Sequence, residues 1–204
     1  DGGGAIQFQD RSSNLEQRLE YEMAILQQVR EALEYKQLVV YAQPIFPTQV
    51  QVMATERRLE LLVRLRAQSG EIISPADFFP IMNQYAYTPK IDMAILEKVV
   101  KLIGPLKQQG WKVHVNLSPI TITKPTNLEY ILKQLDSMTL EQGQLCFEIT
   151  EHAIMKYTRS TLVFMAAARP RGVTFAVVEF GSGYASFGTL GEFNCEYIKL
   201  GSGL

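Results

Sequence analysis

Strand-like and helix-like segments alternate along most of this chain, and this alternation restricts its fold more than any other feature. Short runs rich in β-branched and aromatic residues predict six strands, at 38–46, 50–66 (with a turn or bend), 111–118, 145–151, 173–180 and 196–200. Apolar residues at helical spacing predict helices between them, at 75–84, 89–110, 126–136 and 152–169. Strands that alternate with helices indicate βα units around a parallel sheet.

Polar residues recur where the predicted strands end, which favours a (β/α)8 TIM-type barrel over a doubly wound sheet. Asn116, Glu148, Glu179 and Lys199 each fall at or near the carboxyl end of a strand, and Glu60 lies within one. The carboxyl ends of barrel strands meet at one mouth, where such folds carry their sites. Carboxylates, an amide and an amine are costly to bury there unless they coordinate something. We therefore expect one shared polar site.

The composition is that of a globular domain and argues against two classes of function. Hydrophobic residues make up 47% of the 204 residues, charged residues make up 20%, and the formal net charge is −1. Without a basic excess, binding to a nucleic-acid polymer is not expected. No apolar run approaches the ~18 residues that a membrane span needs, and no signal peptide opens the chain. We expect a cytoplasmic protein.

Cysteine and histidine form no metal motif in the sequence. Cys146 and Cys195 are far apart, without a neighbouring histidine or second cysteine, so we expect buried free thiols in a reducing compartment. His114 and His152 are equally isolated. His114 lies in KVHVNLS, close to the expected polar site, but a strand histidine packed beside the core is the preferred interpretation.

A long helix is predicted before the first strand. Ser13 and Glu16 form an S-x-x-E capping box that would start it. Its expected apolar stripe consists of Leu15, Leu19, Met23, Leu26, Val29 and Leu33. Such a helix either serves signalling or dimerisation, or packs on the domain, and both interpretations stay open. We divide the chain into a linker and helix at 1–36 and a barrel domain at 37–204.

A series of short motifs follows one another from about residue 31 to the end: YAQPIF, ELLVRLR, ISPADFFP, VNLS, FEITE, VVEFGSGYAS and YIKLG. In this order they resemble the EAL family, the cyclic-di-GMP phosphodiesterase domain of bacteria. The tripeptide EAL at 31–33 is not the family signature, because it precedes the first strand. The signature corresponds to ELLVRLR. The first residues are similar to the tail of a GGDEF domain, which implies a GGDEF–EAL tandem.

The resemblance implies a metal-dependent site. Glu60, Asn116 and Glu148 match ligands of two Mg²⁺ or Mn²⁺ ions, which activate a water for attack on the phosphodiester. Glu179 stands in the place of a further ligand. Lys199 matches the lysine beside the catalytic water, so the implied catalytic residues are Lys199 and Glu60.

The resemblance also implies a nucleotide-binding pair, Gln43 and Arg64. Gln43 belongs to the family's Gln-Pro pair, and Arg64 follows the signature glutamate. The planar fork of an arginine suits a phosphate, because it donates two parallel hydrogen bonds. Cyclic-di-GMP is therefore the expected ligand.

Three positions depart from the family pattern, and all three fall on the chemistry. The first aspartate of the family's DDFG is Val178 here, which offers no oxygen. The second is Glu179, one methylene longer, whereas metal–ligand distances tolerate only about ±0.2 Å. The aspartate after the family's lysine is Gly201. These departures imply a degenerate member of the family.

Three functions stay open from the sequence. The preferred one is a degenerate EAL domain that acts as a cyclic-di-GMP receptor or regulatory module with little or no hydrolysis. The second is a working phosphodiesterase that produces linear pGpG, with Glu179 as a substitute ligand. The third is a scaffold for dimerisation through the N-terminal helix. The expected partners are cyclic-di-GMP, an upstream GGDEF or sensor domain and a second copy in a homodimer.

The predicted barrel is incomplete at its C-terminus. It has six strands in 204 residues, whereas a (β/α)8 barrel typically needs ~250 residues. A barrel that stops there exposes sheet edges. Either a C-terminal part lies outside this sequence, or a partner completes the fold.

Overall fold

A computed structural model of the chain describes residues 6–47, 56–67, 69–181 and 191–201. The described strands are β1 (Leu38–Ile45), β2 (Arg57–Arg66), β3 (Ile72–Ile73), β4 (Trp111–Asn116), β5 (Leu145–Thr150), β6 (Val173–Phe180) and β7 (Tyr197–Leu200). The described helices are α1 (Ile6–Glu34), α2 (Pro75–Gln84), α3 (Thr88–Gln108), α4 (Pro119–Ile122), α5 (Pro125–Ser137), α6 (Glu151–Lys156), α7 (Thr158–Ala168) and the short 3-10 helix η2 (Arg169–Arg171).

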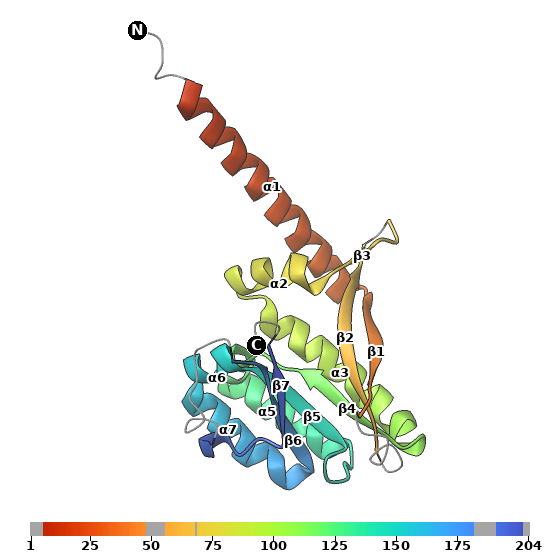
Figure 1. Ribbon diagram of the computed structural model, residues 1–204. Coiled ribbons are helices and arrows are strands. Elements are labelled where there is room, and N and C mark those ends of the chain that lie inside the picture. The colour runs from red at the N-terminus through yellow and green to blue at the C-terminus, as the bar shows by residue number, and fades with distance from the viewer. Residues whose placement is uncertain (1–5, 48–55, 68, 182–190, 202–204) are drawn as a thin grey trace. The chain divides into compact units, whose positions relative to one another are not determined.

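The strands form one sheet in the order β1-β2-β4-β5-β6-β7, and β3 pairs with β2 off this path. Each neighbouring pair from β2 to β7 along that order is parallel. The helices α3, α5 and α7 contact one another in sequence along the outside of these strands (Figure 1). Parallel strands in chain order with helices on their outer face are the arrangement of a TIM-type barrel. The predicted α/β barrel class is confirmed.

The central strands are buried on both faces, as expected for a parallel sheet covered by helices. Every residue of β5 except the last is buried, and so is nearly all of β6. On their outer face Phe147, Phe175 and the α7 residue Phe164 pack as a trio, with ring centroids 5.5 to 6.3 Å apart. This packing attaches α7 to the strands that carry the polar residues of interest.

The chain divides into two compact units. The first contains residues 1–39 and 64–87, and the second contains 40–63 and 88–204. In the first unit α1 packs against α2, with Val29, Phe78 and Met82 fully buried. The second unit holds the parallel strands and the helices from α3 onward.

The N-terminal helix differs from its prediction in where it begins. Helix α1 already runs from Ile6, so Ser13 lies inside it and the capping box does not start it. No glycine or proline lies between Ile6 and Ser13, and extending an existing helix adds one hydrogen bond for each residue fixed.

The predicted apolar stripe of this helix is confirmed only in part. Val29 is buried and Leu26 and Leu33 are half-buried, whereas Leu15, Leu19 and Met23 are exposed. Among residues 14–34 the other buried positions are Glu22, Ile25 and Ala32. The reason is a polar residue on the buried face. Glu22 accepts hydrogen bonds from Gln84 and Tyr85 of the first unit, so its carboxylate is satisfied within the packed interface.

The predicted helix at 152–169 is two helices, α6 and α7, which meet at Tyr157. Tyr157 has φ −124° and ψ 35°, outside the helical region. The hydroxyl groups of Thr158 and Thr161 donate to backbone carbonyls around this break, a local bonding pattern that competes with a continuous helix.

The first part of the predicted strand at 50–66 lies outside the described residues, and β3 and α4 had not been predicted.

Candidate functional site

The register of the parallel strands places the predicted polar residues on one face of the sheet. Glu60 is the Cα partner of His114, and Asn116 is the partner of Glu148. Glu148 in turn pairs with Ala176 of β6. Residues paired in this way point to the same face, and that face recurs at every second position along a strand. His114 and Asn116 are therefore on the face that also carries Glu60 and Glu148.

Five side chains on this face are joined by direct contacts, and we call them the strand-end cluster. Lys199 Nζ of β7 lies 2.6 Å from Glu60 Oε2 and 2.5 Å from Glu148 Oε1. Asn116 Nδ2 donates to Glu60 Oε1 at 2.9 Å. His114 Nδ1 lies 2.9 Å from Glu148 Oε1. The structure thus brings together four of the predicted site residues, from β2, β4, β5 and β7, and adds a histidine.

Burial and charge pairing have opposite effects on the pKa values of Glu148 and Lys199. The Glu148 side chain is 1% exposed, and burial by itself would raise the pKa of Glu148. Hydrogen bonds from His114 and Lys199 outweigh that effect and hold the pKa of Glu148 below its ordinary value. Burial would likewise lower the pKa of Lys199, but its contacts with Glu148 and Glu60 raise it. Glu148 is therefore an anion and Lys199 a cation at neutral pH.

The position of His114 confirms the sequence interpretation and adds a polar contact to it. It is buried beside the core as expected, but its Nδ1 faces the Glu148 carboxylate, so it belongs to the polar site. The signal was present in the sequence: His114 lies two positions before Asn116, and residues at i and i+2 of a strand share a face.

Val178 lies on the same face as the cluster. It is the Cα partner of Thr150, two positions beyond the pair formed by Glu148 and Ala176. Its side chain is 8% exposed. At position 178, therefore, the face of the cluster carries an isopropyl group, which has no oxygen atom that could bind a cation.

Glu179 is not part of the contacts of the strand-end cluster. It is exposed, and its φ of +57° is in the left-handed region. The register between β6 and β7 shifts between Val177 and Phe180. Glu179 lies at the predicted strand end, but it follows Val178 directly, and successive side chains of a strand alternate between the two faces.

The turn after β6 is held by a buried carboxylate. Gly181 has φ +95°, which suits glycine because it has no Cβ, and its backbone N donates to Glu151 Oε2 at 2.9 Å. Gly181 therefore turns the chain at the end of β6.

The remaining predicted residues lie apart from the contacts given above. Gln43 is exposed in β1, and Arg64 is half-buried in β2, four residues beyond Glu60. The backbone N of Gly201 donates to the carbonyl of Phe180 and so continues the pairing of β7 with β6. A Cβ at Gly201 would lie 3.4 Å from the Glu179 carbonyl, which is ordinary van der Waals contact.

Three carboxylate oxygens of the strand-end cluster already have hydrogen-bond partners in the structure. Mg²⁺ requires near-octahedral oxygen coordination. Both Glu60 oxygens and Glu148 Oε1 already accept hydrogen bonds from Asn116, Lys199 and His114. Among the described residues, no group of three or more histidine, cysteine or acidic side chains is arranged to hold a metal.

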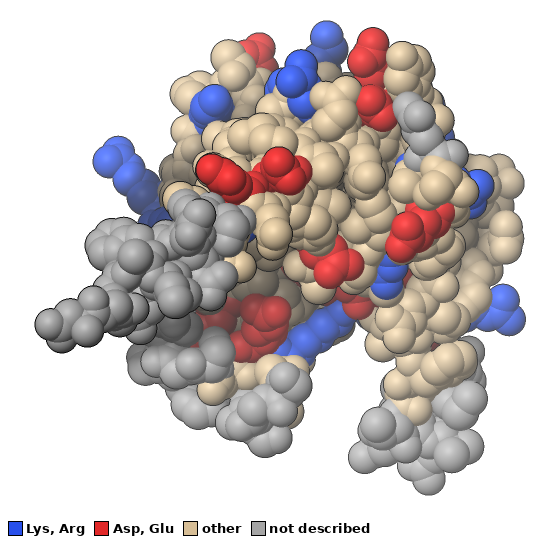
Figure 2. All heavy atoms as spheres, turned by 90° about the horizontal axis from the view of Figure 1, so that it is seen from above, with Lys and Arg blue, Asp and Glu red and all other residues tan. Residues whose placement is uncertain are grey.

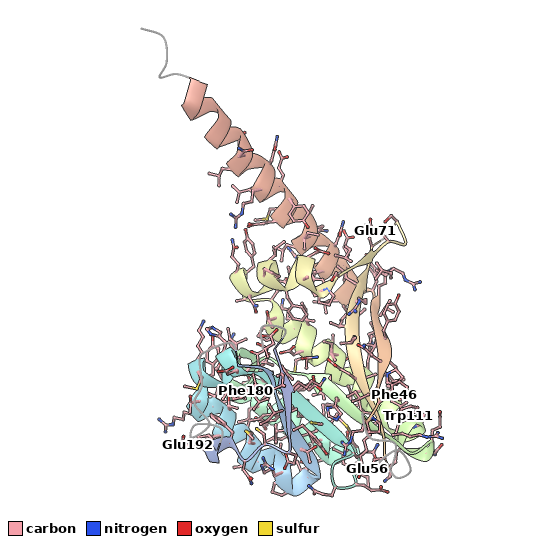
Figure 3. The ribbon with its side chains drawn as sticks, in the orientation of Figure 1. Phe46, Glu56, Glu71, Trp111, Phe180 and Glu192 are labelled. Carbon is pink, nitrogen blue, oxygen red and sulfur yellow. The ribbon has the colours of Figure 1, made fainter. Side chains whose placement is uncertain are left out.

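The surface of the molecule and the ends of its strands can be followed in the figures. On the face drawn in Figure 2, acidic and basic side chains are interspersed, as the near-zero net charge leads one to expect. In Figure 3, Glu56 and Trp111 mark the N-terminal ends of β2 and β4, and Phe180 marks the C-terminal end of β6. No helix in the described part of the chain has the length and apolar character needed to cross a membrane.

Two curated relatives share the sequence pattern. The cyclic di-GMP phosphodiesterase PdeB of Shewanella oneidensis is 30% identical over 175 residues, which are 84% of this chain and 20% of that protein. The cyclic di-GMP phosphodiesterase PdeF of Escherichia coli is 26% identical over 188 residues, 91% of this chain and 24% of that protein. The chain thus spans about a fifth to a quarter of the length of these relatives.

Solved structures share the fold. The FimX EAL domain from Pseudomonas aeruginosa, bound to c-di-GMP, superposes with a TM-score of 0.76 at 24% identity over 89% of this chain and 72% of that one. The PaMucR phosphodiesterase in its c-di-GMP complex gives a TM-score of 0.73 at 25% identity, covering 88% of this chain and 73% of that one. The sequence profile of the EAL domain matches residues 26–204. The chain therefore belongs to the EAL domain family.

Proposed function

We propose that this chain is a receptor or regulatory EAL domain that binds cyclic-di-GMP and hydrolyses it slowly or not at all. Cyclic-di-GMP is the natural candidate ligand because the relatives are named for this nucleotide and the PaMucR structure contains it. A loss of hydrolysis is compatible with binding, because contacts to phosphate and base do not require a pair of metal ions.

The observation that carries the loss of hydrolysis is Val178. It lies on the cluster's face, where the family resemblance implies an aspartate, and it removes one negative charge opposite two dications. Glu179 does not compensate, since its backbone is left-handed and its side chain is exposed. We further propose that Gln43 and Arg64 contact the nucleotide, and that any cation bound at the cluster is Mg²⁺ or Mn²⁺.

Titration calorimetry with cyclic-di-GMP, in EDTA and then in Mn²⁺, tests this function. We expect binding under both conditions, and no more linear pGpG in Mn²⁺ than a Glu60→Ala variant produces. Absence of binding heat in both buffers would contradict the receptor function and leave the dimerisation scaffold.

Arg64→Ala tests the nucleotide contact. Loss of a charged hydrogen-bonding partner for a phosphate typically costs about 1.5–3 kcal/mol, so we expect the Kd for cyclic-di-GMP to rise by about tenfold to a hundredfold. Arg66→Ala is the matched control, because Arg66 is the exposed last residue of the same strand. An equal loss in both variants, or no loss in either, would show that Arg64 makes no specific contact.

A working phosphodiesterase is the second candidate, favoured by the contacts that hold Glu60, Asn116, Glu148 and Lys199 together. It predicts Mn²⁺-dependent production of pGpG that Glu60→Ala abolishes. The same chromatographic assay therefore separates the two functions. We also propose that the chain works beside a GGDEF or sensor domain, since one relative, MucR, is named as a bifunctional diguanylate cyclase and phosphodiesterase.

A further inference from the structure

His114 occupies the innermost position of the strand-end cluster. Its side chain is 4% exposed and that of Glu148 is 1% exposed, so both partners of this contact are shielded from solvent. Lys199 approaches the same Glu148 oxygen from a more open position, with its side chain 33% exposed. The carboxylate thus has a donor on its buried side and another on its open side.

The contact assigns the hydrogen of the imidazole. An ionised carboxylate is only an acceptor, so the His114 Nδ1 must donate to Glu148 Oε1. In the neutral ring Nε2 is then a bare acceptor. This nitrogen is buried and has no hydrogen-bond partner among the described residues, so within the described structure the polar contact of the ring is the one with Glu148.

The ring of His114 also packs against an aromatic ring. The ring of Tyr197 lies against it, with centroids 5.4 Å apart and planes inclined at 55°. The guanidinium of Arg58 covers the Tyr197 ring at 4.6 Å from its centroid. Because protein interiors are close-packed, His114 cannot swing away from Glu148 as readily as the flexible and partly exposed Lys199 can.

A cation that binds Glu148 must compete with both donors. Lys199 can leave along its four-carbon stem, but His114 stays, and its donated hydrogen keeps a lone pair of Oε1 engaged. We propose that His114 is a positioning residue that holds Glu148 as the counter-charge of Lys199 and thereby weakens the binding of a divalent cation at the cluster. This inference deepens the proposed function, on which it rests for its biological meaning, because it gives a reason for cation-independent binding.

The opposite role makes an opposite prediction. Where a carboxylate does ligate a metal, a hydrogen bond from a neighbouring residue usually orients it, and loss of that neighbour typically lowers metal affinity by 10–100-fold. If His114 supported a metal-binding Glu148 in this way, its removal would weaken cation binding. The sign of the change therefore decides between the two roles.

The experiment measures Mn²⁺ affinity without nucleotide, from the electron paramagnetic resonance signal of free Mn²⁺. We expect His114→Ala to bind Mn²⁺ about tenfold more tightly than the unchanged chain. His114→Asn is the matched control, since its amide nitrogen can take the place of Nδ1 and donate to Glu148; its affinity should stay within about twofold of the unchanged chain. Equal or weaker binding by folded His114→Ala would overturn the proposal.

A measurement on the unchanged chain covers the case in which His114→Ala does not fold. Long-range nitrogen–proton NMR should show the His114 ring with its hydrogen on Nδ1, and these signals should stay unshifted with excess Mg²⁺. A ring with no hydrogen on Nδ1, or a shift of these signals with Mg²⁺, would contradict the proposal. The outcome is independent of the nucleotide: failure of cyclic-di-GMP to bind would reject the receptor function and leave the comparison of cation affinities intact.

Discussion

Val178 is the residue at which the proposed loss of hydrolysis can be tested. Val178→Asp would place a carboxylate on the face of the cluster, at a position that is 8% exposed. Without a cation, a buried anion lacking a partner is costly, so we expect the variant to be destabilised in EDTA by roughly 1–3 kcal/mol or more. Added Mn²⁺ should recover most of this loss, because the aspartate supplies the missing ligand.

The control for this change is Val178→Asn, which has nearly the same shape without the charge. Denaturant unfolding with and without Mn²⁺ measures the free energy of unfolding for both variants. The expected result is that Mn²⁺ stabilises Val178→Asp much more than Val178→Asn. Equal responses to Mn²⁺ would mean that position 178 does not face the cation site.

Residues also show how far the sequence could predict the site. Glu60, Asn116, Glu148 and Lys199 could be grouped from strand-end spacing, and the structure brings them into contact. Glu179 lies at the strand end as predicted, but adjacent strand residues alternate between faces, so Val178 and Glu179 do not both face the cluster. His114 was underestimated because an isolated histidine was judged by its sequence neighbours and not by its strand face.

Helix α3 is tied to the segment after β4 by a buried acid. Asp92 Oδ2 accepts from the backbone N of Ser118 at 3.1 Å and from the hydroxyl of Thr121. Burial raises the pKa of Asp92 to about 7, against the opposing effect of these two hydrogen bonds. Asp92 thus holds the backbone that begins two residues after Asn116.

This arrangement predicts a pH dependence of stability. The pKa of Asp92 is higher in the folded chain than in the unfolded chain, so the unfolded state releases its proton first as the pH rises. Its contribution to stability is therefore full below about pH 4 and is lost progressively up to about pH 7. Asp92→Asn has no such proton, so the difference in unfolding midpoint between the two proteins should change across this range. A constant difference from pH 4 to pH 8 would contradict the raised pKa of Asp92.

The contact of α1 with α2 depends on Glu22. Its carboxylate accepts from Gln84 Nε2 and the Tyr85 hydroxyl, each at 3.2 Å, and pairs with Arg18 at 2.9 Å. Glu22→Ala would leave these donors without their acceptor, so hydrogen exchange in α1 and α2 should become faster. Glu20→Ala, at an exposed position of the same helix, is the control and should leave exchange unchanged. Unchanged exchange in both variants would show that apolar packing alone holds the two helices.

The bounds of helices and strands were predicted well where a segment has a clear hydrophobic period over enough residues. Helix α2 and strands β5 and β6 lie within a residue of their predicted bounds. The two-residue β3 and the four-residue α4 are too short to produce a periodic signal. The break between α6 and α7 arises from side-chain bonds of Thr158 and Thr161 to the backbone, which hydrophobic spacing does not record.

At the scale of the whole molecule, the barrel strands carry a cluster whose charged side chains pair with one another. Two carboxylates, an ammonium, an amide and an imidazole contact one another across β2, β4, β5 and β7. A buried cluster whose charged groups are paired with one another can persist without a cation. The proposed receptor function needs a mouth that keeps its shape without a cation, and these contacts support that proposal.

The most direct test of this account is a crystal structure grown with cyclic-di-GMP and Mn²⁺, with anomalous scattering measured for manganese. The account predicts density for the nucleotide at the mouth of the strands, Lys199 still between Glu60 and Glu148, and no pair of manganese peaks. Two ordered manganese ions joined by a water beside the phosphodiester would contradict it.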